Sequence, residues 1–311
     1  METQTETRLK DVLTLLRQGD PFEARKIVGS LFENENDIDN EALIYINKCC
    51  SFWINIINKL EGIRNTFEKN ENILLEWKRF QNYYLNDKDA YEPASFAIQR
   101  GYFSNALEIY EQTFDEKNLC ARAEIYKNAG ICQKKLGNFE EALNLLTEAN
   151  KYYPNQASVL AELADCYSLC GKDRFGKLLF REAFFADPGS IDLDFLDSKL
   201  IRCLITKAQE KGYSGQQLQY WIPVYGVLNG VFNMKRELSS QEVALLKKDI
   251  YAMENEYKDP ACNTGILIPR LLNYYFRLID HYILAHESGA KINEILLKIK
   301  ILDSSVYEAY R

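Results

Sequence analysis

Histidine and carboxylate side chains are the groups of this sequence that could act in acid–base catalysis. The chain has two histidines, His281 and His286, which stand five positions apart and do not share one face of a helix. They are not part of an H-E-x-x-H pattern, and no pair of carboxylates stands out in an apolar setting. The sequence also lacks a glycine-rich phosphate loop and a G-x-S-x-G nucleophile turn. We therefore expect no enzyme, no catalytic residues and no cofactor.

Cysteine is the second residue type that could carry chemistry, and the chain has eight, at positions 49, 50, 120, 132, 166, 170, 203 and 262. Cys166 and Cys170 are four residues apart and would share a helix face, but a metal ion needs more ligands than these two. Free cysteine packs as a small hydrophobic residue. We therefore expect reduced, mostly buried thiols and no metal site.

The charge of the chain bears on its partners. The net charge is −7 and the pI is near 5.2, and the basic residues are scattered or paired on mixed faces. Nucleic-acid binding needs a basic surface that neutralises phosphates. We therefore expect no nucleic-acid partner.

The sequence begins with Met-Glu-Thr-Gln-Thr-Glu and shows neither a basic segment followed by an apolar one nor an apolar run near 18 residues. We expect a cytoplasmic protein with no membrane insertion.

The elements that carry these residues are predicted to be helices. The chain has only 15 Gly and 7 Pro in 311 residues, and apolar residues recur with a helical period along most of its length. Two segments of 34 residues, 123–156 and 157–190, also align with each other without a gap. The aligned pairs are Gly137 with Gly171, Ala142 with Gly176, Leu146 with Phe180, Ala149 with Ala183, and Pro154 with Pro188.

This pattern resembles the tetratricopeptide-repeat (TPR) family, in which each repeat is a pair of antiparallel helices. The family has small residues at repeat positions 8, 20 and 27 and large ones at 4, 11 and 24, although Gln133 replaces the usual aromatic residue at position 11. Small residues let two helix backbones approach, and large ones fill the space between them. The resemblance implies an all-α superhelix of stacked helix pairs, a TPR solenoid with a C-terminal helical extension.

In TPR arrays the first helix of each repeat lines a concave surface that binds proteins or peptides. The resemblance places the following candidate partner-binding residues on that surface: Glu124, Lys127, Ile131, Lys134, Lys135, Ala161, Asp165 and Ser168. Some TPR proteins hold a terminal carboxylate of chaperones with a Lys/Asn clamp. Ile131 and Glu162 stand where that clamp needs asparagine, so we expect no chaperone-tail clamp here.

We assign residues 1–190 to a repeat array in which residues 1–122 are degenerate. Residues 9–32 are expected to form a helix, a Gly19-Asp20-Pro21 turn and a second helix. Residues 40–88 are expected to form a hairpin of longer helices. Gly101 stands 36 residues before Gly137 and is expected to mark the turn of a third repeat, with Phe103, Ala106 and Tyr110 after it.

Residues 191–311 are assigned to a C-terminal helical cap or module. The expected helices are 192–211, 216–234 with a break or kink at Pro223, 239–257 with a capping box, 269–286, 291–301 and a short one from 303. The aromatic residues of this part are expected to be core more often than binding site: Tyr220, Trp221, Tyr225, Tyr274, Tyr275, Phe276 and Tyr282.

Three functions remain open. The first is a non-enzymatic scaffold or adaptor that binds a protein or peptide in a larger complex, which the TPR resemblance implies. The second is a homo-oligomeric structural component that uses an exposed end of the array. The third is a ligand sensor or enzyme with a site in the C-terminal helical region.

Overall fold

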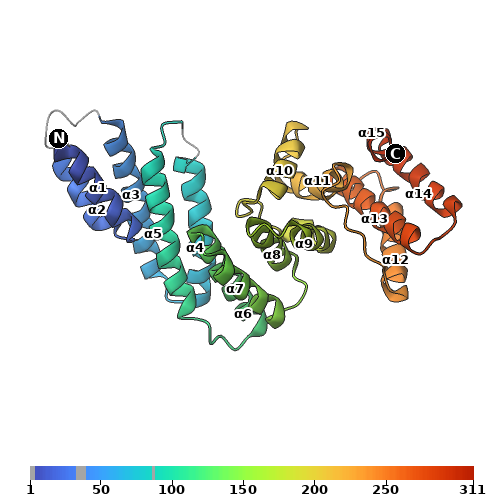
Figure 1. The fold of residues 1–311 in the computed structure, drawn as a ribbon, viewed down its shortest axis with the longest axis horizontal. Coiled ribbons are helices and arrows are strands. Elements are labelled where there is room, and N and C mark those ends of the chain that lie inside the picture. The colour runs from blue at the N-terminus through green and yellow to red at the C-terminus, as the bar shows by residue number, and fades with distance from the viewer. Residues whose placement is uncertain (1–3, 33–39, 86–87) are drawn as a thin grey trace. The chain divides into compact units, whose positions relative to one another are not determined.

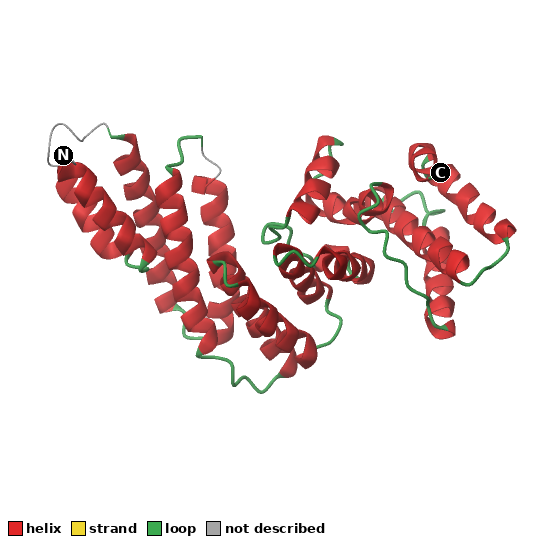
Figure 2. Cartoon of the chain, viewed as in Figure 1, coloured by secondary structure: helices red, strands yellow, loops and turns green. Residues whose placement is uncertain are grey.

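The computed structural model describes residues 4–32, 40–85 and 88–311, and all regular elements in these ranges are helices (Figure 1, Figure 2). The expected all-α class is therefore confirmed. The chain divides into two compact units, unit 1 (Met1–Tyr153) and unit 2 (Pro154–Arg311). Within the described ranges, no helix is both long and apolar enough to cross a lipid bilayer.

Unit 1 contains seven α-helices and one π-helix in its described residues. They are α1 (Gln4–Arg17), α2 (Pro21–Phe32), α3 (Glu41–Gly62), α4 (Thr66–Phe80), the π-helix η1 (Gln81–Leu85), α5 (Glu92–Glu111), α6 (Leu119–Leu136) and α7 (Phe139–Tyr152). The α1–α2 hairpin turns at Gly19, whose φ is 82°. This confirms the two expected N-terminal helix pairs, α1–α2 and α3–α4, although residues 86 and 87 of the second expected window lie outside the described residues.

The expected turn at Gly101 is wrong, because Gly101 lies in the middle of the single long helix α5. α5 packs on α1, α4 and α6. A Cβ on Gly101 would collide with the Leu16 carbonyl oxygen and would lie 2.9 Å from the Gly19 nitrogen and 2.8 Å from the Trp53 ring. The glycine is therefore needed for the close approach of α5 to the end of α1, and not for a turn.

The two repeated segments each form a helical hairpin, α6–α7 in unit 1 and α8–α9 in unit 2. Their turns contain Gly137 and Gly171 with φ of 87° and 72°, as the sequence predicts. Inside the first hairpin a Cβ on Gly130 would lie 2.7 Å from Leu146 Cγ. Inside the second, a Cβ on Gly176 would lie 2.9 Å from the Ala164 carbonyl oxygen. The small residues thus let the paired helices approach, as the repeat pattern requires.

Unit 2 contains eight α-helices and one short 3-10 helix. They are α8 (Ala157–Leu169), α9 (Asp173–Ala186), the 3-10 helix η2 (Pro188–Ser190), α10 (Lys199–Glu210), α11 (Gly215–Leu228), α12 (Ser240–Glu256), α13 (Thr264–Leu284), α14 (Gly289–Leu302) and α15 (Ser304–Tyr310). The division between the units follows Tyr153 and separates the two repeated hairpins. It does not coincide with the boundary at residue 190 that the repeat pattern suggests.

Two local predictions in unit 2 need correction. The helix expected over 192–211 begins only at Lys199, because residues 191–198 form an irregular segment held by hydrogen bonds to α8. The break expected at Pro223 is absent, since Pro223 is buried inside the continuous helix α11, which packs between α10 and α13. The Ser239–Glu242 capping box at the start of α12 is confirmed.

A buried charge network joins α9 to α13 in unit 2. Arg181 pairs with Asp280, and Arg277 pairs with Glu182 at 2.7 Å, with both arginines largely buried. Burial, with the nearby Arg277 charge as a second cause, lowers the pKa of Arg181 to about 10. Buried charges are tolerated only when they are paired, so this network fixes how α9 sits on α13.

We predict that Gly101→Ala lowers the free energy of unfolding by about 1–3 kcal/mol, because the new methyl group forces α1 and α5 apart. Urea unfolding of the full chain, followed by circular dichroism, measures this change.

Gly29→Ala is the matched control, because Gly29 lies in α2 and the added Cβ would meet no atom within 4 Å beyond the adjacent residues and the nearby backbone of α2 itself. This substitution is expected to raise the free energy of unfolding by about 0.5–1 kcal/mol. A stabilising effect at both positions would contradict the close approach of α5 to α1.

Candidate binding site

The eight residues that the TPR resemblance placed on a binding surface lie in two different units. Glu124, Lys127, Ile131, Lys134 and Lys135 are on α6 of unit 1, while Ala161, Asp165 and Ser168 are on α8 of unit 2. Each set is therefore described by itself.

On α6, two of the five side chains are buried. Ile131 and Lys134 are each 3% exposed, so the expectation that they point into an open groove is wrong for them. Glu124 and Lys127 are partly exposed and form an ion pair of 2.5 Å along the helix. Lys135 is also partly exposed. Binding of a partner by these three residues stays a prediction.

On α8, Asp165 is fully buried and has a structural role. Its two carboxylate oxygens accept hydrogen bonds from the backbone N–H groups of Asp197 and Ser198, at 2.9 and 2.8 Å. Ser198 is the N-cap residue of α10, where a negative charge also meets the positive end of the helix dipole. The expectation that Asp165 faces a partner is therefore wrong.

The other two α8 residues also face inward. Ala161 is buried in a hydrophobic cluster with helices of unit 2. The Ser168 hydroxyl oxygen is buried and lies against Gly176 of α9, so it is directed into the hairpin. No open surface is formed by these α8 positions.

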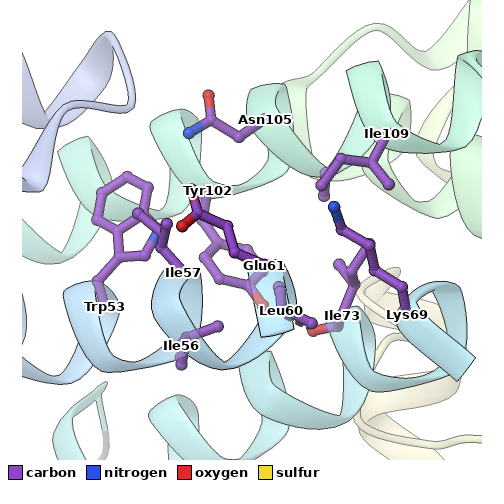
Figure 3. A pocket seen from close by; sticks show the side chains of 11 residues that line it. Trp53, Ile56, Ile57, Leu60, Glu61, Lys69, Ile73, Tyr102, Asn105 and Ile109 are labelled. Carbon is purple, nitrogen blue, oxygen red and sulfur yellow. Dashed lines mark hydrogen bonds between the residues drawn. The ribbon is translucent and has the colours of Figure 1, made fainter. Parts of the chain in front are cut away.

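An apolar groove in unit 1, which we call the α3–α5 groove, is a better candidate for binding (Figure 3). Its walls come from three helices that are distant in sequence: α3 supplies Trp53, Ile56, Ile57, Leu60 and Glu61, α4 supplies Lys69 and Ile73, and α5 supplies Tyr102, Asn105, Ala106 and Ile109. The groove encloses about 190 Å³.

The polar groups inside the groove are already used within the protein. Tyr102 donates its hydroxyl hydrogen to the Ile73 carbonyl oxygen at 2.7 Å, and Asn105 donates from Nδ2 to the Gly19 carbonyl oxygen at 3.0 Å. Burial raises the pKa of Tyr102 well above its usual range, so the phenol stays protonated. The walls therefore offer mainly apolar contact to an occupant.

Two opposite charges stand at the edge of the groove. Lys69 is partly buried and Glu61 is exposed, and no ion pair joins them in the described part of the chain. In Figure 3 the Lys69 side chain extends toward Ile109. An occupant would thus meet an apolar floor and a charged rim, as in the core and rim of protein interfaces.

The sequence alone could not identify this groove. Helical periodicity marks apolar faces on α3, α4 and α5, but a core helix and a groove-lining helix have the same pattern. The small Ala106 lines the groove beside the larger Trp53 and Tyr102, whose ring centres are 5.9 Å apart.

Most of the C-terminal aromatic residues lie in the core, as expected, and two of them are partly exposed. Trp221, Tyr274, Tyr275, Phe276 and Tyr282 are buried in one cluster. Tyr225 packs against that cluster while partly exposed, and Tyr220 is partly exposed at the edge of a hollow.

We predict that Asp165→Asn lowers the free energy of unfolding by about 1–3 kcal/mol, because an NH2 group, which cannot accept a hydrogen bond, replaces one of the two oxygens that accept from the backbone. Chemical denaturation measures this loss. Asp249→Asn, on the exposed side of α12, is the control and should change stability by less than about 0.5 kcal/mol. Equal stability of both variants would mean that the Asp165 carboxylate does not hold the start of α10.

No protein-family model matches this sequence, and no curated protein matches it. A function for the chain is therefore inferred from its own residues.

Proposed function

We propose that this chain is a non-enzymatic scaffold that binds another protein, and that the α3–α5 groove holds an apolar anchor side chain of that partner. The observation that supports this most is the groove itself, with its apolar walls and charged rim. Protein interfaces are commonly anchored by one large side chain that fills such a pocket, with polar contacts around it.

The size of the groove supports a side chain as its occupant. Pockets for drug-sized molecules and cofactors usually enclose about 300–1,000 Å³. The α3–α5 groove encloses about 190 Å³, slightly more than the apolar cavity of about 150 Å³ that accommodates benzene in another protein. One aromatic or large aliphatic side chain fits this space.

The chemistry of the walls supports the same occupant. A small polar ligand needs convergent hydrogen-bonding groups that fix its orientation. Tyr102 and Asn105 already donate to carbonyl oxygens of the protein, so the groove has little to offer such a ligand. An apolar side chain needs only contact and the exclusion of water.

The packing of the two repeated helix pairs supports a scaffold of the TPR type. In α6–α7 and α8–α9 the small residues at repeat position 8 or 20 lie against the partner helix, which is the packing that the resemblance implies. We propose that these pairs are TPR repeats and that the chain acts in the assembly or regulation of a larger complex.

The proposal is tested with a displayed library of random peptides selected on the purified full chain. The selected peptides should share one large apolar residue, and Ile57→Glu should weaken their binding by about thirtyfold, because a charge replaces an apolar wall. Lys69→Glu should change which charged residues flank the anchor. Fluorescence anisotropy of labelled peptides measures both effects.

Leu75→Glu is the matched control, since Leu75 is an exposed apolar residue of α4 outside the groove. It should leave binding within about twofold of the unsubstituted chain, and circular dichroism should show equal helix content for all variants. Peptides that bind Ile57→Glu as tightly as the unsubstituted chain would exclude the groove. Selection of no peptides, together with a mass that rises with protein concentration, would favour the homo-oligomeric alternative instead.

A further inference from the structure

A second hollow lies entirely within unit 2 and has a different chemical character. It encloses about 250 Å³ where the end of α9 and the turn η2 meet α11 and α13. Its lining includes the polar side chains of Asp187, Tyr220, Arg270 and Asn273. They come from three different elements, so the fold, and not the local sequence, brings them together.

One wall of the hollow is an aromatic surface that holds a cation. The rings of Phe185 and Tyr274 are 4.8 Å apart, and the Arg270 guanidinium lies 5.9 Å from the centre of the Tyr274 ring. A cation over an aromatic face is held by the electric field of the ring. Arg270 is exposed, and this contact leaves its N–H donors available at the hollow.

Asn273 is fixed on the same face of α13 as Arg270, three residues along the helix. Its Nδ2 donates to the Phe184 carbonyl oxygen at 3.2 Å, which orients the amide. The Oδ1 atom remains as an acceptor at the hollow.

The other wall carries the negative charge. Asp187 caps η2, and its Oδ1 accepts a hydrogen bond from the Gly189 N–H at 3.1 Å. Gln219 of α11 holds this turn by donating to the Gly189 and Ile191 carbonyl oxygens at 3.3 and 2.7 Å. The Tyr220 hydroxyl lies beside the same turn, 3.4 Å from where a Cβ on Gly189 would be.

The two charges of the hollow are not neutralised by the protein. No ion pair within 4 Å joins Arg270 to Asp187, or either of them to another side chain, in the part of the chain that the structure describes. The charges of the nearby buried network, in contrast, are paired. Arg270 and Asp187 are both exposed side chains that line the same hollow, so a ligand that carries both charges itself could pair with each of them.

We propose that this hollow binds a free α-amino acid. The ligand carboxylate would accept hydrogen bonds from the Arg270 guanidinium, which suits the planar group with two oxygens. The ligand ammonium would donate to the Asp187 carboxylate and to Asn273 Oδ1, and the Tyr220 hydroxyl would complete the polar contacts.

The arrangement disfavours simpler ligands. A phosphate or another anion would be attracted by Arg270 but repelled by Asp187. An amine without a carboxylate would be attracted by Asp187 but repelled by Arg270. A nucleotide exceeds the space, since the hollow is smaller than the usual range of about 300–1,000 Å³ for larger ligands.

Isothermal titration calorimetry on the full chain, with each common L-amino acid as the probe, tests the proposal. At least one amino acid should bind, while acetate and methylammonium, which each carry one of its two charges, should bind at least about tenfold more weakly. Arg270→Gln should weaken amino-acid binding by about tenfold or more. Asp187→Asn should do the same while it keeps the cap of η2, because an asparagine oxygen also accepts the Gly189 hydrogen bond.

Arg174→Gln and Asp173→Asn are the matched controls. Both residues are exposed at the start of α9, about 15 Å along the helix from Phe184. They should leave the affinity within about twofold. The α3–α5 groove variant Ile57→Glu should also leave it unchanged, so the two sites are tested separately.

Three results would overturn the proposal. The first is that no amino acid binds at millimolar concentration. The second is that acetate or methylammonium binds as tightly as the amino acid. The third is that Arg270→Gln and Asp187→Asn bind as the unsubstituted chain does, which would place any bound amino acid elsewhere.

Discussion

The close approach of helix backbones at positions without a side chain is the constraint on which both units depend. Gly101 lets α5 lie against the end of α1, Gly130 makes room for Leu146 between α6 and α7, and Gly176 brings α9 onto α8. At Gly101 and Gly176 an added methyl group would meet a backbone carbonyl oxygen of the neighbouring helix, and at Gly130 it would meet the Leu146 side chain. Because protein interiors are close-packed, these three contacts determine which large residues fill the space beside them.

Buried polar groups also fix the positions of helices, mainly in unit 2. Asp165 holds the start of α10 through two backbone hydrogen bonds, and the pairs Arg181–Asp280 and Arg277–Glu182 connect α9 with α13. Each of these groups would be costly to bury alone. The second repeated hairpin is therefore tied to the C-terminal helices through charges and hydrogen bonds, which is consistent with its place in the same compact unit.

The two hollows differ in how their polar groups are satisfied. In the α3–α5 groove, Tyr102 and Asn105 donate to the protein itself, and the remaining surface suits an apolar side chain. In the unit 2 hollow, Arg270 and Asp187 have no ion-pair partner in the described residues, and the surface suits a small ligand with two charges. This difference in used and unused donors and acceptors is why we propose a protein partner for the first and a small molecule for the second.

Local features of the chain could be predicted from the sequence because their causes are local. The glycine turns at Gly137 and Gly171 and the capping box at Ser239 depend on a few neighbouring residues, and each is found where the pattern places it. The small residues that pack inside the two repeated hairpins were also predictable, since they follow a fixed spacing within one helix pair.

What only the tertiary structure decided depends on residues far apart in the sequence. Gly101 has the spacing that predicts a turn, but it lies inside α5. A glycine is required there because the helix packs against α1, more than 80 residues earlier in the chain. The repeat pattern predicts Asp165 on the surface, but the residue is buried. Its carboxylate accepts hydrogen bonds from the backbone N–H groups of residues 197 and 198, more than 30 positions later in the chain. Both hollows are likewise formed by side chains from several elements, three in the α3–α5 groove and four in the unit 2 hollow. Helical periodicity records only that a face is apolar, not what lies opposite that face.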